Sequence, residues 1–199
     1  MEISTELVKQ LREASGAGVL ECRKTLEQTG GDLDKAVAIL REKGMAKAAK
    51  KAERAAHEGR VELYAHPGNR VGVVLELNCE TDFVANTDTF KTLAHDLALH
   101  IAFASPRYVK PEDIPADVIE TQKVKFRAEA LATGKPEAIL DKIVQGKLDK
   151  FYDEVCLLRQ PFVRDDKVKV GDLVTSLIAT IGENIVVRRF TRYELGEDL

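Results

Sequence analysis

The sequence has no strong excess of charge, no long hydrophobic run and no sign of a secretion signal. Its 30 lysine and arginine residues nearly balance 33 aspartate and glutamate residues, for a net charge of −3. Such a chain is not a polyanion binder as a whole, so any basic surface must be local. The longest largely apolar stretch, Leu173 to Ile181, is shorter than the roughly 20 residues that cross a bilayer. Because the start, Met1 to Glu6, also lacks the basic-then-apolar order of a signal peptide, we expect a cytosolic (cytoplasmic) protein with no membrane association.

Cysteine and histidine are scarce, and neither forms a metal or disulfide pattern. Cys22, Cys79 and Cys156 are odd in number, far apart and without a Cys-x-x-Cys pair. This spacing argues against a disulfide framework and a zinc site, so we expect reduced, partly buried thiols. His95 and His100 fall on one predicted helix at a spacing that does not direct both rings toward one metal. The sequence predicts no resident metal.

The motifs of common enzymes are missing as well. No Gly-x-Ser-x-Gly is present. The Gly-rich stretch 15–18 lacks a preceding strand, and Gly134-Lys135 is followed by Pro136 where a phosphate loop needs Ser or Thr. We therefore expect no enzyme activity, no catalytic residue and no cofactor.

Residues 1–43 are predicted to form a bundle of three short helices. Ser4 or Thr5 caps the first helix, the Gly-rich stretch 15–18 ends it, and Asp32 caps the third. Apolar residues recur at helical spacing in all three segments, which is typical of a small bundle. The core of such a bundle is thin, so its spare surface suits an adaptor role.

Residues 44–59 are rich in alanine and basic groups and have no stripe of large apolar residues. This composition predicts a helical, solvated linker. Its cations could instead grip RNA, although no aromatic residues stand between them: Lys47, Lys50, Lys51 and Arg54. RNA binding is thus the less favoured alternative for this segment.

Residues 60–199 predict an α+β domain. A hairpin is expected over 60–77, and a helix with one apolar side over 88–103. Two charged helices, 116–132 and 136–155, are predicted to pair antiparallel, and a helix over 170–181 precedes a closing strand over 183–193. A strand after helices, added to an early hairpin, indicates a small three-stranded antiparallel sheet with helices.

The segment Asn78 to Asn86 is the strongest candidate for a functional loop, because it places Asp82 beside Phe83 between a predicted strand and helix. A Phe exposed on a loop held at both ends loses little entropy when it enters a partner. Two alternatives exist: Phe83 packs under the sheet while Asp82 or Asn86 caps the helix, or Glu80 and Asp82 form an acid pair for hydrolysis or metal binding. The metal alternative is weak because no third ligand is nearby.

Three separated segments resemble the bacterial elongation factor Ts family. They are residues 3–26, with Ser15-Gly16-Ala17-Gly18-Val19-Leu20; residues 78–85, Asn-Cys-Glu-Thr-Asp-Phe-Val-Ala; and residues 134–162, from Gly134-Lys135-Pro136 to Gln160-Pro161-Phe162. They occur in the family's order and extend over nearly the whole chain. The resemblance implies a guanine-nucleotide exchange factor for the GTPase elongation factor Tu, and an amino-terminal bundle similar to ubiquitin-associated domains.

The resemblance also implies roles for particular residues. The bundle would dock on the nucleotide-binding domain of the GTPase through Arg12, Val19, Leu20 and Arg23. The loop would dislodge the GTPase's Mg²⁺ through Thr81, Asp82, Phe83 and Val84, with Phe83 exposed. Longer family members carry two core halves, whereas this sequence has one, so we expect a homodimer that uses either the helices of 116–155 or the terminal strand.

Overall fold

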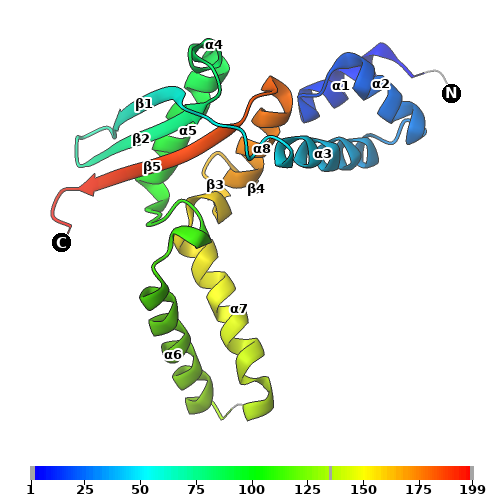
Figure 1. Ribbon diagram of the computed structural model, residues 1–199. Coiled ribbons are helices and arrows are strands. Elements are labelled where there is room, and N and C mark those ends of the chain that lie inside the picture. The colour runs from blue at the N-terminus through cyan, green and yellow to red at the C-terminus, as the bar shows by residue number, and fades with distance from the viewer. Residues whose placement is uncertain (1–2, 135, 198–199) are drawn as a thin grey trace.

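The computed structural model describes residues 3–134 and 136–197, so Met1, Glu2 and Lys135 of the segments discussed above lie outside the described residues. The amino-terminal helices lie beside a sheet that is covered by helices, and a pair of helices projects away from it (Figure 1). This arrangement confirms the predicted α+β class. Among the described residues, every helix is too short or too polar to cross a membrane.

The amino-terminal bundle consists of α1 (Thr5–Ser15), α2 (Val19–Gln28) and α3 (Leu33–Ala49). The Ser4 side chain accepts a hydrogen bond from the Leu7 amide, and the Asp32 side chain accepts one from the Lys35 amide, so both predicted caps are present. Gly16 ends α1 in the left-handed region at φ 67°, which favours glycine. The bundle core is small and consists of Ile3, Val8, Leu11, Cys22, Leu26, Ala36 and Leu40.

The third helix differs from the expectation of a solvated helical linker over 44–59. It continues to Ala49 and packs against α8 (Val170–Ile181), so that Ala48 is buried in the main core. A Cβ added at Gly44 would lie 3.3 Å from the Cβ of Ala179. Small side chains let two helices approach closely, and a stripe of small residues does not look apolar enough in the sequence to predict burial. Beyond Ala49 the chain turns and enters β1 (Glu58–Ala65), so only part of the expected linker is helical.

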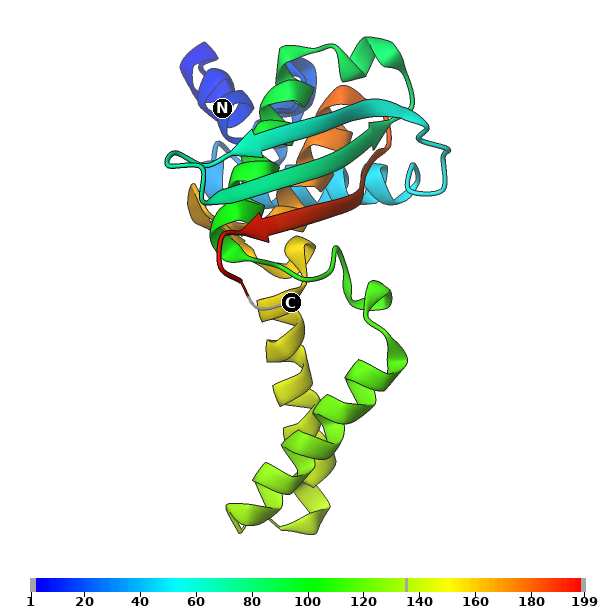
Figure 2. The ribbon, with the colours of Figure 1, turned by 90° about the vertical axis from the view of Figure 1, so that its left-hand side faces the viewer.

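The main sheet contains β1, β2 (Val71–Cys79) and β5 (Ile185–Glu194) in the antiparallel order β1-β2-β5, which confirms the predicted three strands. The helices α5 (Asp88–Ala104) and α8 lie behind one face of this sheet (Figure 2). The core forms between them and contains Leu75, Phe90, Leu97, Ile101 and Val174.

The projecting pair consists of α6 (Ala116–Ala132) and α7 (Glu137–Val155), close to the predicted bounds. The short 3-10 helices η1 (Pro111–Asp113) and η2 (Leu157–Arg159) join the pair to the core. A second, two-stranded sheet is formed by β3 (Pro161–Phe162) and β4 (Asp165–Lys169), in a segment for which no strand was expected. β3 is only two residues long and four of the five residues of β4 are charged, so neither shows an alternating apolar pattern in the sequence.

All three cysteines are free and buried, in agreement with the expected reduced thiols. Burial raises the pKa of Cys79 and of Cys156 to about 11. Both side chains therefore stay protonated at neutral pH, and neither has the thiolate character that a reactive cysteine needs.

Candidate functional site

The loop between β2 and α4 (Asp82–Ala85) is anchored by the segment that precedes β5. The carboxylate of Glu183 accepts hydrogen bonds from the Thr81 amide at 3.0 Å and from the Thr81 hydroxyl at 2.7 Å. The Glu80 carboxylate in turn accepts a 2.6 Å hydrogen bond from the Asn184 amide. The start of α4 is thus held in place by residues about a hundred positions further along the chain.

Asn184 extends this anchor to the end of the amino-terminal segment. Its buried side-chain amide donates to the carbonyl oxygens of Ala52 at 3.3 Å and Arg54 at 2.8 Å. The Arg54 guanidinium lies 3.6 Å from the Glu80 carboxylate. Glu80 is therefore engaged in fixing the loop, which argues against its use with Asp82 as an acid pair.

Threonines cap the two helices of this region, so the alternative in which Asp82 or Asn86 caps the helix is wrong. The Thr81 hydroxyl accepts from the Val84 amide at 3.4 Å at the start of α4. The Thr87 hydroxyl accepts from the Phe90 amide at 3.3 Å at the start of α5. Each threonine precedes its helix in an extended conformation, the position from which a side-chain oxygen reaches the third amide. Asp82 lies inside the helix instead.

Phe83 lies on the outer side of α4 with 82% of its surface exposed, so the alternative in which it packs under the sheet is wrong. Asp82 is exposed beside it, whereas Val84 is half-buried against the main core and Ala85 is buried. Of the residues expected to act on Mg²⁺, Thr81 and Val84 hold the turn while Asp82 and Phe83 project from it. Burial of an exposed Phe ring by a partner would stabilise the complex by about 1.5–3 kcal/mol.

The thiol of Cys79 supports the same turn from inside. Its Sγ donates to the Thr81 carbonyl oxygen at 3.1 Å. Because burial holds the pKa of this thiol at about 11, the proton stays in place and the bond persists at neutral pH.

The residues expected to dock on a GTPase are all exposed on the amino-terminal bundle. Arg12 lies near the end of α1, and Val19, Leu20 and Arg23 lie in the first turns of α2. Val19 is 53% exposed and Leu20 is 75% exposed. The α1–α2 pair and α4 both lie on the side of the molecule away from the α6–α7 pair, in both views (Figures 1 and 2).

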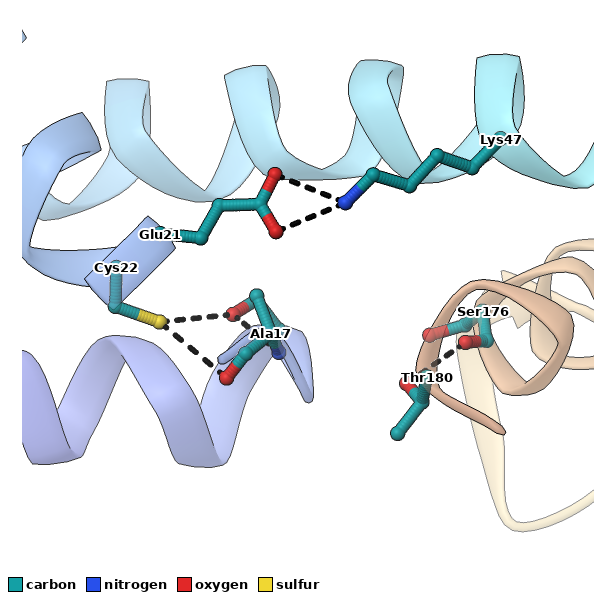
Figure 3. Close-up of polar contacts among 7 residues, drawn as sticks. Ala17, Glu21, Cys22, Lys47, Ser176 and Thr180 are labelled. Atoms are coloured by element: carbon teal, nitrogen blue, oxygen red, sulfur yellow. Dashed lines mark hydrogen bonds and ion pairs between the residues drawn. The ribbon is translucent and has the colours of Figure 1, made fainter. Parts of the chain in front are cut away.

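The turn between α1 and α2 rests on α8, and this contact sets the position of the bundle. A Cβ added at Gly16 would lie 2.8 Å from the Thr180 hydroxyl oxygen. A cavity of about 370 Å³ lies among the α1–α2 turn, α3 and α8, with the Glu21–Lys47 ion pair at 2.9 Å on one side and Ser176 and Thr180 on the other (Figure 3). The Thr180 hydroxyl donates to the Ser176 carbonyl, and Arg41 pairs with Asp172 across the gap. The polar groups around this cavity are thus paired with one another.

The histidines are not arranged for catalysis. The buried His100 has Nε2 2.9 Å from the Gln160 side-chain oxygen, and its Nδ1 accepts from the Val163 amide at 3.2 Å. Burial lowers the pKa of His100, so the neutral ring holds the β3 segment against α5. Among the described residues, no three His, Cys, Asp or Glu side chains cluster closely enough to hold a metal ion.

The structure thus presents exposed apolar side chains at two places, Val19 and Leu20 on the bundle and Phe83 on α4, as proteins that bind other macromolecules do. Comparison with known proteins identifies the class further. A family model described as "Elongation factor TS" matches residues 3–176. The chain is 55% identical over 197 residues to elongation factor Ts of Carboxydothermus hydrogenoformans. The aligned region covers 99% of this chain and 91% of that protein.

Two further relatives are covered along their whole length. Elongation factor Ts of Herpetosiphon aurantiacus is 54% identical over 198 residues, and that of Coprothermobacter proteolyticus is 56% identical over 197 residues; in both cases 100% of the relative is covered. The comparison extends over 100% of this chain in the first case and 99% in the second. The chain belongs to the elongation factor Ts family, and it is a nucleotide exchange factor for elongation factor Tu, not an enzyme. The resemblance seen in the sequence is confirmed.

Proposed function

We propose that α4 is the part of this exchange factor that enters elongation factor Tu beside its Mg²⁺. Asp82 and Phe83 would contact the GTPase directly, while Thr81 and Val84 hold the turn in position. The observation that carries this proposal is the 82% exposure of Phe83 on a turn anchored by Glu183. An anchored turn pays its ordering entropy during folding, so more of the binding free energy remains for the complex.

The proposed mechanism follows from how a phosphate-loop GTPase holds GDP. Mg²⁺ and backbone amides bind the diphosphate, so displacing the segments that support the metal loosens the nucleotide. Burial of the Phe83 ring supplies about 1.5–3 kcal/mol toward that displacement, and the Asp82 carboxylate accepts hydrogen bonds in the displaced arrangement. This coupling is reciprocal. The exchange factor lowers the affinity of the GTPase for nucleotide, and bound nucleotide lowers the affinity of the GTPase for the exchange factor by the same factor. GTP therefore releases this protein.

We further propose that residues 1–43 dock on the GTPase through Arg12, Val19, Leu20 and Arg23. An exposed apolar pair between two cations suits a contact with an apolar core and a polar rim. Residues 60–199 would then present α4, with residues 44–59 joining the two domains. Because translation elongation takes place in the cytoplasm, we propose that location for this chain.

One face of the main sheet has no covering helix among the described residues (Figure 2). Leu63 lies opposite Val74 in the register, and Tyr193 lies opposite Gly72 on the same face. The exposed apolar side chains of this face are Val61, Leu63, Val74 and Tyr193. We propose that a second copy of the chain covers this face, so that two single cores form a homodimer.

Release of fluorescent GDP from elongation factor Tu tests the role of α4. Phe83→Ala is expected to lose most of the exchange activity, because the ring contributes to the complex and not to the core. Phe103→Ala is the matched control, since Phe103 is also highly exposed, at 76%, but lies at the far end of α5. Equal activity of the two variants would exclude the proposed role of Phe83.

A further inference from the structure

A groove between α6 and α7 concentrates positive charge in a chain whose net charge is −3. The two helices diverge toward the core (Figure 2), and side chains of both line a groove of about 480 Å³. Its lining includes four cationic residues, Arg107, Lys125, Lys147 and Lys150, and one acidic residue, Glu154. Any basic surface of this chain must be local, given its net charge, and this groove is such a surface.

Most of these cations lack an acidic partner. Arg107, Lys125 and Lys150 form no ion pair with any other residue in the described ranges 3–134 and 136–197, whereas Lys147 lies 2.6 Å from the Glu129 carboxylate. Elsewhere on α6, Lys123 lies 3.7 Å from the Glu120 carboxylate and Arg127 lies 2.8 Å from the Asp141 carboxylate. Unpaired like charges in one groove repel one another, so their concentration is costly without an anionic ligand.

Aromatic rings stand among the cations. Phe126 and Phe151 line the groove and are half-buried, and the Lys147 ammonium lies 5.6 Å from the centre of the Phe126 ring. Cations that follow a phosphate backbone, together with rings that stack on bases, are the pattern of proteins that bind single-stranded nucleic acid. The basic segment 47–54, which the sequence offered as an RNA-binding alternative, has no such rings and packs into the core through Ala48.

We propose that the α6–α7 groove binds single-stranded RNA, with Arg107, Lys125 and Lys150 on successive phosphates and a base against Phe151. An acidic peptide would satisfy the cations but leave the aromatic faces unused, so the lining favours a polynucleotide. The α6–α7 pair projects away from α4 and from the α1–α2 turn (Figure 1), so RNA bound there would leave the surfaces proposed for nucleotide exchange free.

Fluorescence anisotropy of the full-length chain with a labelled single-stranded RNA of about 12 nucleotides tests the proposal. Three phosphate contacts predict a slope of about −2 for log K against log salt concentration. Removing two of them, in Lys125→Gln/Lys150→Gln, should weaken binding about tenfold at low salt and make the slope shallower by about 1.4. The matched control, Lys123→Gln/Lys142→Gln, changes the net charge equally on the same helices and should bind within twofold of the parent.

A ring variant separates stacking from charge. Phe151→Leu should weaken RNA binding about tenfold while leaving the salt slope unchanged, because no phosphate contact is lost. Melting temperatures of all variants establish that they are folded, and GDP release from elongation factor Tu should match the parent in every case. The proposal is overturned if the control pair weakens binding as much as the groove pair. It is also overturned if Phe151→Leu binds RNA normally and polyglutamate competes as well as RNA, which would indicate an acidic protein partner.

Discussion

The anchor between Glu183 and Thr81 gives the most detailed prediction, because it connects the stability of α4 to exchange activity. Glu183→Ala removes an acceptor that bonds both the Thr81 amide and the Thr81 hydroxyl. A hydrogen bond to a charged group contributes about 1.5–3 kcal/mol, and the half-exposed position of Glu183 places each bond at the low end. We expect a loss of about 2–3 kcal/mol in the free energy of unfolding. Glu120→Ala, at an exposed pair on α6, should change it by less than about 0.5 kcal/mol.

A double-mutant cycle isolates the contact itself. Thr81→Val removes the 2.7 Å hydroxyl bond to Glu183 and the cap of α4, but keeps the backbone amide bond. The double variant Thr81→Val/Glu183→Ala should therefore lose about 1–1.5 kcal/mol less unfolding free energy than the two single variants lose in total. Urea denaturation measures these values. Additivity within about 0.3 kcal/mol would refute the contact.

The same variant tests preorganisation. In Glu183→Ala the start of α4 is no longer held, so it must be ordered when α4 enters the GTPase. Ordering the backbone of one residue costs about 1.4 kcal/mol. That cost corresponds to a roughly tenfold slower release of GDP at saturating factor. An unchanged rate in Glu183→Ala, with the stability loss present, would show that α4 does not need to be held rigidly.

Three further predictions concern other parts of the molecule. Val19→Asp should weaken affinity for elongation factor Tu, because it places a charge against an apolar contact, while the maximal rate of GDP release is kept. If saturating amounts of the variant do not restore the rate, the bundle takes a direct part in opening the nucleotide site. Sedimentation should give twice the 22.0 kDa chain mass at micromolar concentration, and Leu63→Glu should give the monomer, whereas a monomeric parent with full activity would exclude the dimer. Because burial lowers the pKa of His100, the unfolded chain binds the extra proton more readily, so stability should fall as pH drops below about 6.5. His100→Asn should reduce this dependence, and an unchanged pH profile would contradict it.

Much of the fold could be predicted because its elements carry local signals. The period of 3.6 residues located the three bundle helices and α5, and two strand-like runs separated by a turn located the β1–β2 hairpin. The two errors have a common cause. Near the carboxyl-terminal end of α3 a single small residue, Ala48, is buried against the core, and β3 is only two residues long, so neither carries a periodic apolar pattern.

The candidate site was predictable only in part. Asp82 and Phe83 are neighbours in the sequence, and the resemblance to elongation factor Ts pointed to them. Glu183 and Asn184, which anchor Thr81 and Glu80, are about a hundred positions away and look like ordinary polar residues before a strand. The α6–α7 groove was missed for the same reason, because its cations come from three segments that only the folded chain brings together.

Chelation of Mg²⁺ distinguishes displacement of the metal from other ways in which Asp82 and Phe83 could release GDP. If they act mainly by displacing Mg²⁺, EDTA performs part of their task in advance, and the parent and Phe83→Ala should converge in rate. We therefore predict that the ratio of their GDP release rates at saturating factor shrinks substantially when EDTA replaces Mg²⁺. Each tenfold contraction assigns about 1.4 kcal/mol of the barrier to the metal. A ratio that stays the same with and without Mg²⁺ would contradict metal displacement as the function of α4.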